Sequence, residues 1–148
     1  WRKRMKIGNF NLEKDGTYII AELSANHNGN LQIALDTIKM AKEIGQLDIG
    51  QTVVVKHKAV KAVEAIEGTD ECIKRGGALG RGDAVVVKVA KPNQDLRFDV
   101  PTVGVKTINS MIVANSKALA IEADNTLLVE KSKVLELAKK NNITIVAL

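Results

Sequence analysis

The stretch Ala84–Gly104 (AVVVKVAKPNQDLRFDVPTVG) constrains the fold of this chain more than any other. It opens with an apolar, largely β-branched run from Ala84 to Ala90, interrupted by Lys88, which predicts a buried strand. Lys91-Pro92-Asn93 ends that strand, because proline lacks a ladder donor and asparagine favours turns. A helix is predicted at Thr107–Ala114, so the intervening loop lies where α/β proteins usually carry their chemistry.

Charged side chains alternate along this loop. Asp95, Arg97 and Asp99 are spaced two apart, so an extended backbone would project all three to one face. Carboxylates beside guanidinium and ammonium groups suit a divalent cation together with phosphate oxygens. The alternative is a solvated loop held by surface ion pairs, and the pattern alone leaves both interpretations open.

Composition narrows the class of partner. The chain has 148 residues, enough for one domain, and its formal net charge of +5 permits anionic partners such as phosphates, nucleotides or acidic lipid headgroups. Aromatic residues make up 3%, so stacking platforms are scarce and we expect no nucleic-acid partner. No apolar run approaches the roughly 20 residues that span a bilayer. The single cysteine, Cys72, fits a reducing compartment, so we expect a cytoplasmic protein in which Cys72 is a packing residue.

Strand and helix patterns alternate along the chain, with hairpins inserted, which predicts a single α/β domain with a mixed, layered sheet and flanking helices. A helix at Leu31–Ile44 can serve as a crossover between strands at Tyr18–Leu23 and Thr52–Lys56. Further predicted strands are Lys6–Leu12, Ala59–Ala65, Leu119–Glu122, Thr126–Val129 and Ile143–Leu148, and further predicted helices are Asp70–Arg75 and Ser132–Lys140. The glycines at 76, 77, 80 and 82 match no phosphate-binding pattern and predict a flexible passage.

A second polar cluster lies at Glu64–Asp70, with Glu67, Thr69 and Asp70 as its central members. Thr69 or Asp70 is predicted to cap the following helix. Acids and a hydroxyl at a helix N-terminus could form a site for phosphate or a metal ion. They could equally be a cap with acids that complement the helix dipole. His57, at the tip of a predicted hairpin, is expected to be exposed to solvent.

Four stretches carry a resemblance to a known family from Ala41 onward. They are LDIGQTVVVK at Leu47–Lys56, AVEAIEGTD at Ala62–Asp70, KRGGALG at Lys74–Gly80 and VKVAKPNQDLRFDVPTVG at Val87–Gly104. This part of the chain resembles the C-terminal domain of UDP-2,3-diacylglucosamine pyrophosphatases. The resemblance implies a metal-dependent hydrolase of lipid A biosynthesis. Such an enzyme cleaves the pyrophosphate of UDP-2,3-diacylglucosamine to give UMP and 2,3-diacylglucosamine 1-phosphate.

The resemblance assigns expected roles. Asp99 and Asp95 are the expected catalytic carboxylates, and Asp99 with Glu67 would bind Mg²⁺ or Mn²⁺. The expected substrate-binding residues are Lys88, Lys91, Gln94, Arg97, Thr69 and Asp70. The expected partner is a UDP-linked acylated glucosamine. Peripheral contact with the inner face of the bacterial inner membrane and formation of a homo-oligomer both stay open.

The beginning of the chain resembles a different family. MKIGNF at Met5–Phe10 and YIIAELSANHNGNLQIAL at Tyr18–Leu35 are similar to the opening of pseudaminic acid and sialic acid synthases. Those are barrel enzymes that condense phosphoenolpyruvate with an amino sugar. Eight strands close such a barrel, and this segment supplies a hairpin, one strand and one helix, so we expect no synthase activity.

Both resemblances meet at AKEIG, Ala41–Gly45, which looks like a splice point. We therefore expect residues 1–45 to be a synthase-like fragment, with Trp1–Arg4 as an added remnant before Met5. Residues 46–148 would be a pyrophosphatase-type α/β domain. Two hypotheses follow: a hydrolase impaired because its family's N-terminal domain is missing, or a catalytically inactive chimera of two enzymes.

Overall fold

Five strands form the central sheet of the computed structural model, which describes residues 6–7, 10–11, 31–91 and 100–147. Their order across the sheet is β4-β3-β5-β7-β9. The strands are β3 Thr52–Lys56, β4 Ala59–Val63, β5 Val85–Lys88, β7 Ala118–Ile121 and β9 Thr144–Ala147. β5, β7 and β9 run parallel, whereas β3 is antiparallel to both of its neighbours. The mixed α/β sheet expected from the sequence is confirmed.

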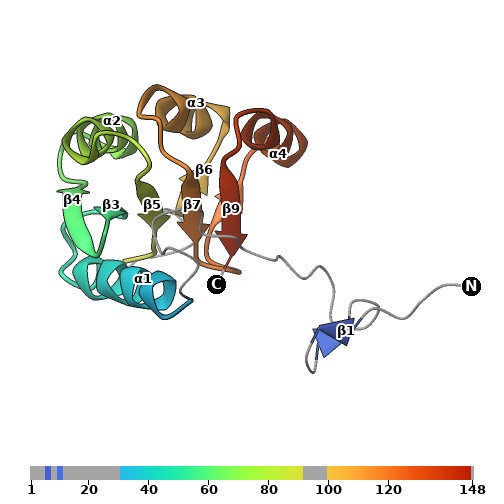
Figure 1. The fold of residues 1–148 in the computed structure, drawn as a ribbon, viewed down its shortest axis with the longest axis horizontal. Coiled ribbons are helices and arrows are strands. Elements are labelled where there is room, and N and C mark those ends of the chain that lie inside the picture. Colours follow the sequence, from blue (N-terminus) through green and yellow to red (C-terminus); the bar gives the residue numbers. More distant parts are fainter. Residues whose placement is uncertain (1–5, 8–9, 12–30, 92–99, 148) are drawn as a thin grey trace, which may run out of the picture.

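Helices cover both faces of this sheet. α2 Thr69–Gly80, α3 Val105–Val113 and α4 Lys131–Lys140 lie on one face, and α1 Leu31–Gly45 lies on the other (Figure 1). Two short pairs complete the described structure, β1 Lys6–Ile7 with β2 Phe10–Asn11 and β6 Thr102–Val103 with β8 Leu127–Leu128. The result is a layered arrangement in which α1 packs on the face of β3 that lies opposite α2.

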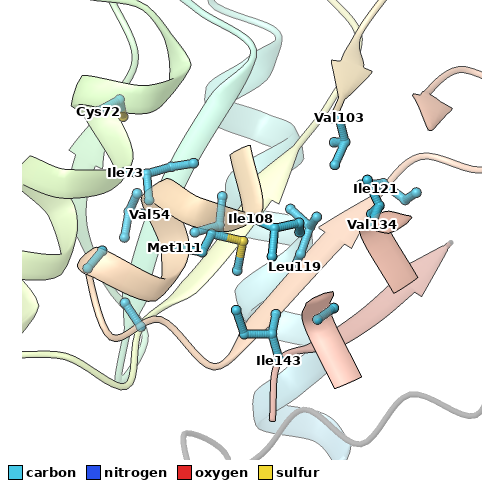
Figure 2. Packing of buried hydrophobic residues seen from close by; sticks show 14 of the residues in the cluster. Val54, Cys72, Ile73, Val103, Ile108, Met111, Leu119, Ile121, Val134 and Ile143 are labelled. Carbon is cyan, nitrogen blue, oxygen red and sulfur yellow. The ribbon is translucent and has the colours of Figure 1, made fainter. Parts of the chain in front are cut away.

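The core divides into two clusters because strand side chains alternate between faces. Val54, Val86 and Leu119 point to the larger cluster, where they meet Ile108 and Met111 of α3 (Figure 2). The intervening residues of β3 and β5 belong to the smaller cluster under α1, whose buried members are Ala41, Val53, Val55, Val85, Val87, Val89, Ala118, Ala120 and Val146. The continuous valine runs of β3 and β5 are therefore buried on both faces, as expected for central strands.

The hairpin between β3 and β4 confirms its prediction, although it contains no glycine. His57 and Lys58 adopt φ angles of 52° and 59°, the left-handed conformation that a two-residue primed turn requires. His57 is exposed, as expected. The second strand is shorter than predicted, since it ends at Val63.

The helix predicted at Asp70–Arg75 is confirmed but is longer than expected, and the flexible passage predicted after it is wrong at Gly76, Gly77 and Gly80. α2 runs from Thr69 to Gly80, so it includes Gly76 and Gly77. A Cβ atom at Gly76 would lie 2.5 Å from Cβ of Val54, and one at Gly77 would lie 2.5 Å from Cβ of Ala114. These glycines let α2 approach the sheet and α3 closely, and this packing outweighs their poor helix propensity. The N-cap is Gly68, not Thr69 or Asp70.

Other boundaries differ by one or two residues, since helix ends are weakly encoded. α3 begins at Val105, two residues before the predicted start. Thr126–Val129 was predicted as a strand, but its two-residue β8 pairs with β6 outside the central sheet. The strand predicted at Tyr18–Leu23 lies outside the described residues.

Within the part that the structure describes, no helix is long and apolar enough to cross a membrane.

Candidate functional site

Three of the polar residues that the sequence singles out, Thr69, Asp70 and Lys88, lie together at the carboxyl edge of the parallel strands. Lys88 ends β5, and its side chain contacts Thr69 in the first turn of α2. This is the edge at which open α/β sheets generally bind ligands. We therefore describe the side chains at this edge first.

Lys88 is a nearly buried cation, with 4% of its surface exposed. Its Nζ donates to Oγ1 of Thr69 at 2.8 Å, and Thr69 in turn donates to Oε1 of Glu64 at 3.0 Å. Thr52, the register partner of Lys88 on β3, donates its hydroxyl to Thr69 at 3.3 Å. A buried ammonium is costly unless it is hydrogen-bonded and charge-compensated, so this network explains how the sheet tolerates Lys88.

Asp70 links the beginnings of α2 and α3. Its Oδ1 accepts a hydrogen bond from Ser110 at 3.1 Å, and its Oδ2 lies 3.0 Å from Nζ of Lys106. Lys106 is 88% exposed, so water screens this ion pair and it contributes little to stability. The carboxylate of Asp70 nevertheless lies one residue from Thr69, at the first turn of α2.

Glu67 is held away from this network. Its carboxylate accepts a hydrogen bond from Arg75, whose guanidinium also donates to the carbonyl of Val63 at 2.9 Å. The hydrogen bond from Arg75 lowers the pKa of Glu67 below its usual value. Among the residues that the structure describes, no group of three or more His, Cys, Asp or Glu side chains could hold a metal ion.

The end of β5 is tied to α1 and β7 by Glu122. One carboxylate oxygen accepts from the backbone N–H of Ala90 at 2.8 Å, and the other lies 3.3 Å from Nζ of Lys42. The next residue, Lys91, lies 3.2 Å from Oδ1 of Asp48. The chain is thus anchored at two points, Ala90 and Lys91, just before the segment 92–99.

Cys72 is a packing residue, as the sequence predicted. It has no exposed surface, and its Sγ lies 3.8 Å from the carbonyl oxygen of Thr52. Burial raises the pKa of its thiol to about 12, so the reactive thiolate is suppressed at neutral pH.

Comparison with known proteins assigns the chain to a family. The family model described as the LpxI C-terminal domain matches residues 15–146. The chain belongs to the LpxI C-terminal domain family. The UDP-2,3-diacylglucosamine pyrophosphatase LpxI of Caulobacter vibrioides is 42% identical to it over 105 residues, which are 66% of this chain and 36% of that protein. The aligned part of the chain therefore spans about a third of the length of this relative.

A second similarity supports the chimeric interpretation. Pseudaminic acid synthases from two strains of Campylobacter jejuni are 61% identical over 41 residues, 28% of this chain and 12% of each synthase. The resemblances to both families are thereby confirmed. The family match begins at residue 15, inside the segment interpreted as synthase-like, so the boundary at residues 45 and 46 stays a prediction.

The structure brings together three of the residues predicted for the site, Thr69, Asp70 and Lys88. Glu67 and Lys91 lie in separate ion pairs. The other predicted site residues, Gln94, Asp95, Arg97 and Asp99, lie outside the described residues.

Sequence reasoning did not single out Thr52 or Ser110. Thr52 joins the network through its pairing with β5, and Ser110 through the packing of α3 beside α2. One signal was available for Thr52, because a hydroxyl that begins a buried valine run needs a hydrogen-bond partner.

Proposed function

We propose that this chain carries the pyrophosphate-binding half of a metal-dependent hydrolase that cleaves UDP-2,3-diacylglucosamine to UMP and 2,3-diacylglucosamine 1-phosphate. The observation that carries the proposal is the buried ammonium of Lys88, fixed by Thr69 at the first turn of α2. Family membership supports the same reaction, since the Caulobacter relative is a UDP-2,3-diacylglucosamine pyrophosphatase.

A pyrophosphate group would meet several positive features at this edge. The first amide groups of α2 lack intrahelical acceptors and favour anions. Lys88 adds a full positive charge beside them, and its low exposure means that water screens its field weakly. Lys91 and Arg97 would supply further cations, and Gln94 a polar contact. Cations fixed before the reaction stabilise charge that develops on phosphate oxygens without reorganising.

Asp99, with Asp95 assisting, would hold Mg²⁺ or Mn²⁺. The donor chemistry fits, because carboxylate oxygens are the ligands that these hard cations prefer. When bound, such an ion polarises a phosphoryl oxygen and lowers the pKa of a coordinated water. Glu67, the second predicted ligand, would have to exchange its ion pair with Arg75 for the cation. Asp70 would orient substrate from the start of α2.

The substrate sets the expected surroundings. It is a UDP-linked sugar with two acyl chains, so the enzyme would meet it on the cytoplasmic side of the inner membrane. The net charge of +5 favours peripheral contact with acidic lipid headgroups. In a homo-oligomer, a second subunit would cover the carboxyl edge of the parallel strands, which is open in the single chain.

The test is release of UMP from UDP-2,3-diacylglucosamine with added Mg²⁺ or Mn²⁺. We expect Asp99→Asn to abolish the release and to leave the melting temperature within a few degrees of the native value, because a carboxylate in the loop that the sequence predicts would contribute little to the core. EDTA should stop the native reaction, and added metal should restore it. An Asp99→Asn protein that hydrolyses normally but melts earlier would show that Asp99 is a structural residue.

A second candidate is a folded but inactive chimera. Two segments of the chain resemble two different enzymes, since the chain aligns with 36% of the Caulobacter pyrophosphatase and with 12% of the synthases. This candidate predicts a cooperative unfolding transition, no UMP release with either metal, and binding of uridine nucleotides that is weak at best. Micromolar binding of UDP-2,3-diacylglucosamine measured by calorimetry would exclude it.

A further inference from the structure

The hydroxyl of Thr69 is fully used by its neighbours. A threonine hydroxyl has one hydrogen to donate and two lone pairs that accept. Thr69 donates its hydrogen to Oε1 of Glu64 at 3.0 Å. Its oxygen accepts from Nζ of Lys88 at 2.8 Å and from the hydroxyl of Thr52 at 3.3 Å. A phosphate oxygen requires a donor, so in this arrangement the side chain of Thr69 holds Lys88 and does not bind phosphate itself.

The acceptor behind Thr69 is a carboxylate with one oxygen left over. Oε1 of Glu64 accepts from Thr69, whereas Oε2 is buried and has no hydrogen-bond partner among the residues that the structure describes. A buried carboxylate oxygen without a partner is costly, and a nearby cation reduces that cost. The ammonium of Lys88, on a side chain that is almost completely buried, lies one hydroxyl group away from this carboxylate.

Two neighbouring acids are engaged with other cations. The carboxylates of Glu67 and Asp70 both lie in ion pairs. Glu64 is instead linked to Lys88 through the hydroxyl of Thr69. Opposite charges that are separated by one hydroxyl still attract each other strongly where water is largely excluded. The carboxylate of Glu64 therefore offsets part of the positive field that Lys88 produces at the sheet edge.

We propose that Glu64 is a positioning residue for Lys88 and that its charge limits how tightly the site holds phosphate anions. Glu64 fixes the direction of the Thr69 hydroxyl, which in turn holds the ammonium of Lys88 at the first turn of α2. The same negative charge repels a phosphate group that binds beside Lys88. Weaker binding of the ground state leaves more of the binding energy for the transition state. The inference rests on the proposed function for the identity of the anion.

The test compares the binding of inorganic pyrophosphate and inorganic phosphate by calorimetry on the full chain, with EDTA present to remove divalent metal. Glu64→Gln keeps an acceptor oxygen for Thr69 and removes the negative charge. We expect this variant to bind pyrophosphate about tenfold more tightly than the native protein does. The gain for phosphate should be smaller, because phosphate carries less charge. A merely structural role of Glu64 would not make the gain depend on the charge of the anion.

Glu136→Gln on α4 is the matched control for net charge. Glu136 is exposed, and the substitution removes the same charge as Glu64→Gln does. Salt screens exposed charges, so the control should change the affinity for pyrophosphate by less than about twofold.

Two variants of Thr69 test the positioning role. Thr69→Ser keeps the hydroxyl bridge and should leave the native affinity for pyrophosphate unchanged. Thr69→Val removes the bridge and should weaken pyrophosphate binding at least about threefold, because Lys88 is no longer held at α2. Equal affinities of the serine and valine variants would contradict the positioning role.

An unchanged affinity in Glu64→Gln, an equal gain in Glu136→Gln, or no binding of pyrophosphate by either the native protein or Glu64→Gln would overturn the inference. UMP release measured in parallel separates it from the proposed function. Metal-dependent UMP release by the native protein, together with unchanged affinities in Glu64→Gln, would keep the hydrolase and remove the role of Glu64. A gain in pyrophosphate affinity in a protein that releases no UMP would support the role of Glu64 and remove the hydrolase.

Discussion

The ammonium nitrogen of Lys88 lies 2.8 Å from the hydroxyl oxygen of Thr69, and this contact joins the central strand to the first turn of α2. The two groups are far apart in the sequence, and they meet because α2 packs on β3 and β3 pairs with β5. Substitutions of two residues in one buried polar network usually have non-additive effects on the free energy of unfolding, because each residue loses its partner when the other is changed.

We predict that Lys88→Met and Thr69→Val are coupled by about 0.5–3 kcal/mol in a double-mutant cycle measured by urea unfolding. The exposed pair Glu71 and Lys74 is the control, for which we expect a coupling of about 0.5 kcal/mol or less. Free energies of unfolding that add within about 0.5 kcal/mol for Lys88 and Thr69 would show that the contact carries no energy.

Replacement of two glycines of α2 by alanine should change the stability of the protein in opposite directions. A Cβ at Gly76 would meet three atoms of Val54 at 2.5–2.7 Å, so Gly76→Ala should destabilise the protein by about 1–3 kcal/mol. At Gly80 the nearest atom would be at 3.7 Å, an ordinary contact. Gly80→Ala should therefore stabilise by up to about 1 kcal/mol through helix propensity. Denaturant titrations of both variants test the pair, and a stabilised Gly76→Ala would refute the close approach of α2.

The buried thiol of Cys72 makes stability depend on alkaline pH. Burial raises its pKa from 9.0 to about 12 in the folded protein, so the folded state keeps a proton that the unfolded state releases. Stability should fall as pH rises from about 9 towards 12, by at most about 1.4 kcal/mol per pH unit for this one proton. Subtracting the pH profile of Cys72→Ala isolates the effect, and parallel profiles would show that the thiol does not contribute.

We predict that Glu122 stabilises the end of β5 by more than its ion pair with the exposed side chain of Lys42 alone would contribute. Glu122→Ala removes the acceptor for the N–H of Ala90 and the ion pair with Lys42, and we expect a loss of about 1–3 kcal/mol. Glu122→Gln keeps an acceptor for Ala90 and should lose less than about 1 kcal/mol. Thermal unfolding compares the two. Equal losses would assign the whole effect to the salt bridge.

Local patterns predicted the sheet well and the helices less well. The valine runs of β3 and β5 are apolar on both faces, so their burial follows from composition alone. The prediction failed at Gly76 and Gly77 because these glycines, which have no Cβ atom, allow close contact with Val54 and Ala114. Those two residues belong to distant segments of the chain. The network around Lys88 depends on the register between β3 and β5, which single-residue patterns do not encode.

The contacts of α1 with the sheet have a consequence for how two unrelated genes could have been joined. Ala41 is fully buried, Ile44 packs beside it, and a Cβ at Gly45 would lie 2.5 Å from Cγ2 of Val89. Lys42 reaches Glu122 from the same turns. The four residues of α1 in these contacts, Ala41, Lys42, Ile44 and Gly45, fall within Ala41–Gly45, where the sequence predicts that the two resemblances meet. A recombination that preserved those five residues would leave the contacts of α1 with the sheet unchanged. The segment upstream of Ala41 could therefore be exchanged without loss of those contacts.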